Sequence, residues 1–169
     1  MRRGALLAAA LAAVPLGGCG LKPLYVGGGG GAIAGTLGQV EVAPIEGKAG
    51  WLVAGALRER LAAMGGGAAR YRLTVRLDDD IVGLGARSDD SVARERRTLR
   101  ARYQLVDAAQ GSVVLDATAG SDAGIDVVGS EYATIAAEST ALERLSETIA
   151  DQIVARLALY ARRTQPPRP

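Results

Sequence analysis

The sequence predicts an α+β fold, a two-layer sandwich with two helices packed on one face of a four-stranded mixed sheet. The periodic segments follow one another in the order β-α-β-β-β-α. The strand segments alternate apolar and polar residues, so each buries one face. Each helical segment carries a single apolar stripe, which a sheet with one apolar face can cover. The opposite face of the sheet is then left to solvent or to a partner.

The first half of this fold rests on two short segments. Residues 40–44 are typical of a short strand that Pro44 ends. Residues 51–64 predict a helix, which three glycines at 65–67 terminate. Its apolar stripe consists of Leu52, Ala56, Leu57, Leu61 and Met64. We expect Trp51, near the start of this helix, to be a packing anchor rather than a ligand contact.

Three further strands are predicted at residues 70–77, 93–106 and 113–119. Apolar residues recur at every second position, so each strand is half-buried. The inward set is Tyr71, Leu73, Val75, Leu77, Leu99, Ala101, Tyr103, Leu105, Val113, Leu115 and Ala117. A turn at 107–111 makes the last two strands an antiparallel hairpin. We expect loops at 83–90 and 120–129, which are rich in glycine and polar residues.

The last element is a long helix from about residue 131 to residue 162. Its apolar residues step by three or four along one stripe. They are Leu142, Leu145, Ile149, Ile153, Leu157 and Tyr160. Arginines at 156, 162 and 163 lie near the negative end of the helix dipole, where cations are favourable.

The amino terminus has the layout of an export signal. Two arginines precede an apolar run from Ala5 to Val14, and small residues follow at a cleavage point. Leu16-Gly17-Gly18-Cys19 resembles the bacterial lipobox, which implies that the Cys19 sulfur carries a diacylglycerol and that the new amino terminus is acylated. Cys19 is the single cysteine, so it cannot form an internal disulfide. The alternative is an ordinary signal peptide that happens to contain a cysteine.

These patterns divide the chain into four parts. Residues 1–18 are predicted to be a signal peptide, and residues 19–38 a lipidated start and glycine-rich tether. Five consecutive glycines at 27–31 favour a flexible tether over a phosphate-binding loop, because no strand precedes them and no helix follows directly. Residues 39–163 form the single domain, and residues 164–169 a disordered tail.

Composition argues against an enzyme. The chain has no histidine, and acylation of Cys19 would leave no thiol. The commonest general base, metal ligand and soft nucleophile are therefore missing. No catalytic, cofactor-binding or metal-binding residues are expected. Removing Arg2 and Arg3 with the signal lowers Lys plus Arg from 20 to 18, equal to the 18 Asp plus Glu. Electrostatic function must then come from local segregation of charge.

Arginines occupy the polar positions of two predicted strands. If these strands are neighbours, one sheet face carries Arg70, Arg72, Arg76, Arg94, Arg96, Arg100 and Arg102. One interpretation is a solvated face balanced by nearby acids. The other is an anion-binding sheet, because the guanidinium group is a planar, bidentate donor for phosphate and carboxylate. Nucleic acid is a poor candidate for an exported, tethered domain with few aromatic residues among the arginines, whereas lipopolysaccharide is the abundant polyanion of an outer membrane.

The segment Cys19-Gly20-Leu21-Lys22-Pro23-Leu24-Tyr25 resembles the start of the lipopolysaccharide-assembly lipoproteins, the LptE-like family. The order of elements is similar to that family's fold over nearly the whole mature chain. The resemblance implies an outer-membrane, lipid-anchored, periplasmic-side protein that plugs the LptD β-barrel, helps it fold and binds lipopolysaccharide through basic residues. Gly20 in place of aspartate agrees with outer-membrane sorting.

The residues expected to contact lipopolysaccharide come from the strand alternation. They are Arg72, Arg76, Arg96, Arg100 and Arg102. An alternative function is that of an auxiliary lipoprotein in a phospholipid or solvent ABC transport system, in which a Pro/Tyr segment also follows the cysteine. The intervening glycines argue against that alternative.

Overall fold

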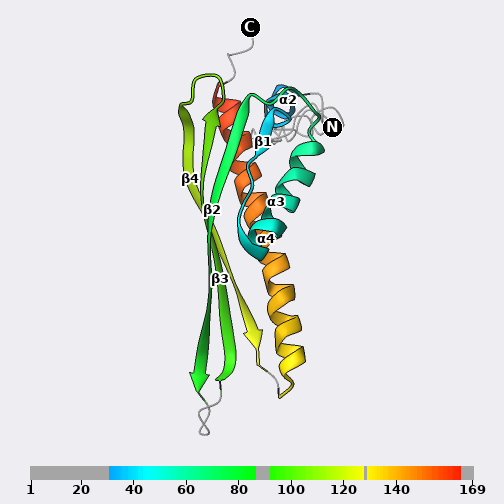
Figure 1. Ribbon diagram of the computed structural model, residues 1–169, viewed down its shortest axis with the longest axis vertical. Helices are drawn as coiled ribbons and strands as arrows, with labels where there is room; N and C mark the ends of the chain where they lie inside the picture. Colours follow the sequence, from blue (N-terminus) through cyan, green and yellow to red (C-terminus); the bar gives the residue numbers. More distant parts are fainter. Residues whose placement is uncertain (1–30, 87–91, 128, 165–169) are drawn as a thin grey trace, which may run out of the picture.

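The computed structural model describes residues 31–86, 92–127 and 129–164. It is an elongated two-layer sandwich in which the two long helices lie on the same side of a twisted sheet (Figure 1). The elements are α2 (Ala32–Leu37), β1 (Val40–Val42), α3 (Gly47–Ala62), β2 (Tyr71–Ala86), β3 (Val92–Asp107), β4 (Val113–Asp126) and α4 (Glu131–Thr164). The predicted α+β class, with helices on a four-stranded mixed sheet, is confirmed.

The sheet has the order β1-β2-β3-β4. The short β1 runs parallel to β2, whereas β2, β3 and β4 form an antiparallel meander. Leu73 is opposite Leu105, and Leu105 is opposite Leu115, so the predicted apolar positions share one face. A bulge between Leu105 and Val106 adjusts the register before the turn into β4.

The core lies between the sheet and the stripe of α4. Leu73, Leu99 and Leu105 are almost fully buried from the sheet side. The helix contributes buried residues about one turn apart, including Leu142, Leu145, Ile149, Ile153 and Leu157. Burying one such side chain contributes about 1.5–3 kcal/mol. The apolar stripes therefore fix how the two layers stack, as the sequence predicts.

A short helix replaces the last part of the predicted tether, so the expectation that no helix follows the five glycines directly is wrong. Residues 32–37 form α2, and its Ala34 and Leu37 are buried, with Leu37 part of the main core. Apolar residues at 33, 34 and 37 give this segment one apolar side, which the flanking glycines hid. Gly38 is required at its end, because a Cβ there would come within 2.2 Å of the Gly65 carbonyl oxygen. Residues 19–30 lie outside the described residues.

All three long strands extend past their predicted ends. The loop predicted at 83–90 is wrong for residues 83–86, which belong to β2. The loop predicted at 120–129 is wrong for residues 120–126, which belong to β4. The acidic run at 78–80 does not stop β2, because Asp79 faces the helices and pairs with Arg97 of β3 while its neighbours point to solvent. Gly120 and Gly124 remain in a regular ladder opposite arginines of β3.

The two long helices also differ from expectation. Helix α3 begins four residues earlier than predicted, and Trp51 is 74% exposed, so the packing-anchor prediction is wrong. Leu52, Val53 and Leu57 take the inward positions instead. Helix α4 reaches Thr164, one residue into the predicted tail. None of residues 131–140 is buried, although residues 141–161 pack regularly against the sheet and α3.

Candidate functional site: the open sheet face

The sheet face turned away from the helices, called here the open face, collects the predicted arginines. Arg72 and Arg76 come from β2, and β3 supplies Arg94, Arg96, Arg100 and Arg102. The register sets Arg76 directly opposite Arg102. Like charges in a directly opposite pair repel each other, which is destabilising unless a counter-charge lies nearby. The alternation therefore brings the five candidate contacts onto one surface.

Part of this charge is neutralised by acidic residues on the same face. Arg102 Nη2 lies 3.2 Å from Asp116 Oδ2, and Arg94 Nε lies 3.0 Å from Asp126 Oδ1. The carboxylate of Asp116 accepts a hydrogen bond from Gln104 and another from Arg102, and these lower its pKa. At the top of the sheet, Arg72 approaches Glu41 of β1 at 3.9 Å. The nearby acids that the solvated interpretation expects are therefore present on part of this face, and anion binding stays a prediction.

Three arginines of the open face have no ion pair among the described residues: Arg76, Arg96 and Arg100. For Arg96 and Arg100 the reason lies partly in β4, although Asp78 of β2 is directly opposite Arg100. Arg100 is opposite Gly120, and Arg96 is opposite Gly124, so β4 offers no side chain to either one. A Cβ at Gly120 would lie 3.7 Å from Arg100 Cγ, which shows how closely the arginine stem covers the glycine.

A hollow of about 620 Å³ lies over this region and is called here the arginine hollow. Its charged lining consists of Arg76, Arg100, Arg102 and Asp78. Gln152 of α4 closes one side, where it clamps the outer edge of β4 by accepting from Gly120 N at 3.1 Å and donating to Gly120 O at 3.2 Å. The hollow is therefore a mainly cationic surface: among the described residues Arg76 and Arg100 form no ion pair, Arg102 pairs with Asp116, and Asp78 lies opposite Arg100.

Two arginines depart from the predicted pattern. Arg70 was expected on the open face, but it precedes β2, where its guanidinium lies 5.1 Å from the Tyr71 ring and 3.6 Å from the buried Asp107 carboxylate. Arg97 was not singled out, because it falls on the apolar side of the alternation. It faces the helices, is 12% exposed and binds both carboxylate oxygens of Asp79. The sequence could have indicated this role, because Arg97 occupies a position where the strand alternation predicts an apolar residue.

The remaining predicted site residue, Cys19, lies outside the described residues. Within the described part of the chain, no helix combines the length and hydropathy needed to cross a bilayer. In the same residues, no three side chains of the metal-binding types come close enough together to hold an ion.

The fold and the open face together define a class: an α+β sandwich whose helix-free sheet face presents arginines that form no ion pair with any described residue. The family model of LptE, described as lipopolysaccharide-assembly, matches residues 37–157. The chain belongs to this family of lipopolysaccharide-assembly lipoproteins. The match spans β1 through most of α4, so it includes every arginine of the open face.

Solved structures share the fold. A candidate lipoprotein from Caulobacter crescentus CB15 is 24% identical, with a TM-score of 0.65 over 81% of this chain and 100% of that one. Rare lipoprotein B from Shewanella oneidensis is 14% identical, with a TM-score of 0.57 over 72% and 94%. A minor lipoprotein from Acinetobacter baumannii is also 14% identical, with a TM-score of 0.57 over 76% and 97%. No curated protein matches the sequence.

Proposed function

We propose that this chain is an outer-membrane lipoprotein, anchored on the periplasmic side through Cys19, that serves as the non-catalytic partner of an LptD-like β-barrel. In this role it assists assembly of the barrel, occupies its interior and binds lipopolysaccharide on the open face. Membership of the lipopolysaccharide-assembly family supports this role over an ABC transport system. A diacylglycerol with a further acyl chain would hold the domain firmly at the membrane, because each buried methylene contributes about 0.8 kcal/mol.

The observation that carries the binding proposal is the set of arginines left without internal partners. Arg76 and Arg100 line the arginine hollow and have no ion pair among the described residues. An exposed guanidinium is well suited to donate two parallel hydrogen bonds to a phosphate or carboxylate oxygen pair. Phosphates and acidic sugars of lipopolysaccharide would supply a counter-charge to Arg76 and Arg100, which form no ion pair with any described residue.

The five candidate arginines are not equivalent in this proposal. Arg76, Arg96 and Arg100 are ready to bind an anion, whereas Arg102 shares its charge with Asp116 and Arg72 with Glu41. Binding through Arg102 or Arg72 must compete with these carboxylates, although both ion pairs are largely exposed and therefore weak. We expect Arg76, Arg96 and Arg100 to contribute more affinity than the other two.

The test is a charge reversal in the full-length mature protein. Arg96→Glu together with Arg100→Glu should lower the affinity for purified lipopolysaccharide at least tenfold, because each lost charge-assisted hydrogen bond contributes about 1.5–3 kcal/mol. The matched control is Arg58→Glu with Arg144→Glu, which changes the same charge on exposed positions of the two helices. Circular dichroism monitors the fold of both variants.

Equal affinity of the two double variants would return the open face to a solvated surface. A cellular experiment tests the wider role. Depletion of the protein should leave the LptD-like barrel misassembled and reduce surface lipopolysaccharide, and normal export after depletion would refute the proposed function.

A further inference from the structure

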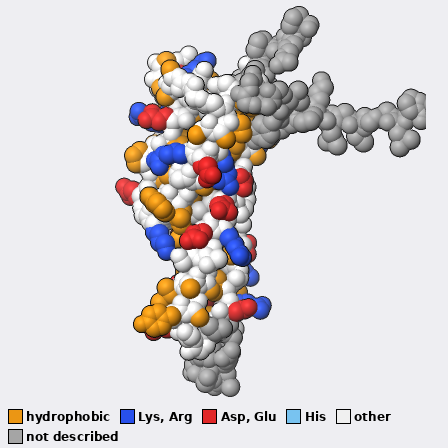
Figure 2. All heavy atoms as spheres, turned by 90° about the vertical axis from the view of Figure 1, so that its right-hand side faces the viewer, with side chains coloured by type: hydrophobic (Ala, Val, Ile, Leu, Met, Phe, Trp, Pro, Cys, Tyr) orange, Lys and Arg blue, Asp and Glu red, His pale blue; other side chains and the backbone are white. Residues whose placement is uncertain are grey.

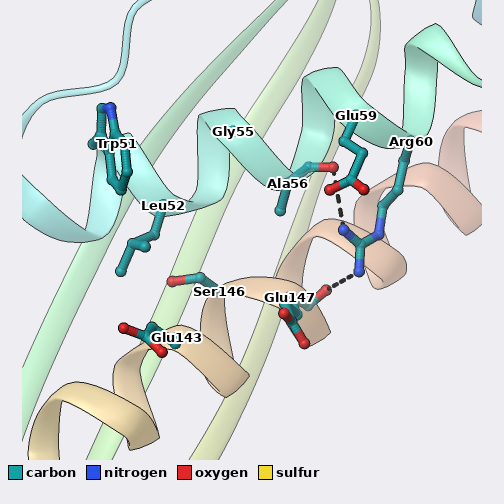
Figure 3. Close-up of a pocket in the computed structure, with 9 residues that line it drawn as sticks. All are labelled: Trp51, Leu52, Gly55, Ala56, Glu59, Arg60, Glu143, Ser146 and Glu147. Carbon is teal, nitrogen blue, oxygen red and sulfur yellow. Dashed lines mark hydrogen bonds between the residues drawn. The ribbon is translucent and has the colours of Figure 1, made fainter.

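A second hollow lies on the opposite side of the molecule, between α3 and α4 (Figure 3). This helix groove has a volume of about 320 Å³. Its α3 side is formed by residues about one turn apart, Trp51, Gly55 and Glu59, and its α4 side by Glu143 and Glu147. Leu52 lies between the two helices and gives the groove an apolar floor.

Trp51 stands at one end of the groove as its largest apolar surface. Trp51 is 74% exposed as a residue, although α3 is otherwise packed by its inward residues. Gly55 is the next residue along the same wall, and a Cβ built there would meet nothing within 4 Å. The glycine costs α3 helix stability and leaves open space beside the indole ring. Figure 2 shows this side of the molecule, on which apolar side chains reach the surface among acidic and basic ones.

The groove lining carries three carboxylates and one guanidinium group, so acidic side chains are in excess. Among the described residues, the carboxylates of Glu59, Glu143 and Glu147 take part in no ion pair. Arg60 is the one cation among the described residues that lines the groove, and its Nε lies 2.5 Å from Asp151 Oδ1, while Nη1 and Nη2 donate to the carbonyl oxygens of Ala56 and Glu147. Asp151, Glu59 and Glu147 therefore share the positive charge of Arg60, and Glu143 adds a further carboxylate, so the groove remains negative overall beside an exposed indole.

We propose that the helix groove binds a segment of a protein partner that presents an arginine or lysine side chain beside an apolar one. The cation would lie over the face of Trp51, where the ring quadrupole attracts it, with Glu143 and Glu147 as counter-ions. The apolar neighbour would cover Leu52 in the space beside Gly55. This surface is distinct from the open face, so it adds a protein contact to the proposed binding of lipopolysaccharide.

Charge decides between the possible occupants. A membrane surface rich in anionic lipid would be repelled by the three carboxylates, although an exposed tryptophan alone would suit it. A second copy of this chain could offer its open face, whose arginines are complementary to the groove. A basic segment of another protein would be complementary to the negative charge and would cover the apolar floor, while the open face stays available for lipopolysaccharide. This segment is the occupant we infer.

The test uses Trp51 as its own reporter, since it is the single tryptophan in the chain. The full-length mature protein is titrated with the blocked peptide acetyl-Leu-Arg-Leu-amide while tryptophan emission is recorded. Binding should quench or blue-shift the emission. The isosteric peptide with citrulline in place of arginine should leave it unchanged, because citrulline has no charge. Glu143→Gln with Glu147→Gln should raise the midpoint of the arginine titration at least tenfold.

The matched control is Asp80→Asn with Asp122→Asn, which removes the same charge from the open face and should leave the midpoint unchanged. Equal responses to the two peptides, or no response to either, would overturn the proposal. It would also be overturned if emission shifted only with protein concentration, which indicates a second copy, or only with phosphatidylglycerol vesicles, which indicates a membrane contact. The arginine charge reversals leave this groove intact, so failure of the lipopolysaccharide proposal is measured separately.

Discussion

Arg97 of β3 and Asp79 of β2 form a bidentate ion pair on the sheet face that is turned toward the helices. Its two nitrogen–oxygen distances are 2.8 and 2.6 Å. Arg97 Nη1 also donates to the Glu138 carbonyl oxygen of α4 at 3.0 Å. The hydrogen bond that Arg97 donates to Asp79 is the main cause of the raised pKa of Arg97. No side chain of residues 131–140 is buried, so this polar contact joins that part of α4 to the sheet.

Removing one partner should cost more than removing both. Asp79→Leu leaves the largely buried guanidinium of Arg97 without its carboxylate, and we expect a loss of about 2–3 kcal/mol in the free energy of unfolding. Asp79→Leu combined with Arg97→Met should recover part of that loss, because it removes the unpaired charge. Urea denaturation of the single and double variants measures the coupling. Additive effects would show that the pair contributes no more than its separate side chains.

Replacing glycine with alanine in α3 should raise the stability of the protein at one position and lower it at another. Gly55→Ala should stabilise the protein by about 0.5–1 kcal/mol, because the helix gains backbone rigidity and the new Cβ meets nothing within 4 Å. Gly50→Ala should destabilise it, because its Cβ would lie 2.6 Å from the Ile45 carbonyl oxygen. Thermal unfolding of both variants checks this. A stabilised Gly50→Ala variant would contradict the described contact.

The sequence predicts the layers of this fold because apolar spacing is a local property. The inward residues of β2 and β3 and the stripe of α4 are found in their predicted places. The open face follows from the same alternation. The strand ends were missed because the aspartates at 78–80 and the glycines at 120 and 124 resemble loop residues until their partners in β3 are known.

Other features depend on contacts that no short segment contains. Arg97 faces the helices because Asp79, 18 residues away, and the Glu138 carbonyl satisfy it there. Trp51 is exposed because its neighbours Leu52 and Val53 turn inward. Which arginines remain unpaired also depends on β4, since Arg102 meets Asp116 whereas Arg100 meets Gly120. The sequence alone therefore predicts the cationic face, but it does not predict which of its arginines form no ion pair with the described residues.

The outer edge of β4 should open locally when its clamp is removed. Gln152 of α4 satisfies both backbone groups of Gly120, as a neighbouring strand would. Gln152→Leu should therefore lower stability by about 1–2 kcal/mol and speed hydrogen exchange of the Gly120 amide more than that of Ala119 or Ser121, which face β3. Hydrogen exchange followed by NMR makes this comparison. Equal acceleration of all three amides would indicate general loosening instead.

Acid titration should reveal the contact between α3 and α4. The hydrogen bond from Arg60 to Asp151 is the main cause that lowers the pKa of this carboxyl. A carboxyl whose pKa is lower in the folded state contributes stability above its unfolded pKa of about 3.9, and that stability is lost as the pH falls through the lower folded value. Arg60→Gln should thus reduce the free energy of unfolding at neutral pH, and the difference from the wild type should shrink below about pH 4.

The Asp151 side chain is 67% exposed, so solvent screens the pair and the difference at neutral pH should stay under about 1 kcal/mol. Carboxyl NMR gives the direct measurement, since Asp151 should titrate below the usual aspartate range in the wild type and within it in Arg60→Gln. If Asp151 has the same pKa in both proteins, Arg60 does not bind it in solution. The helix groove would then contain a free cation, and its charge would no longer favour a basic partner.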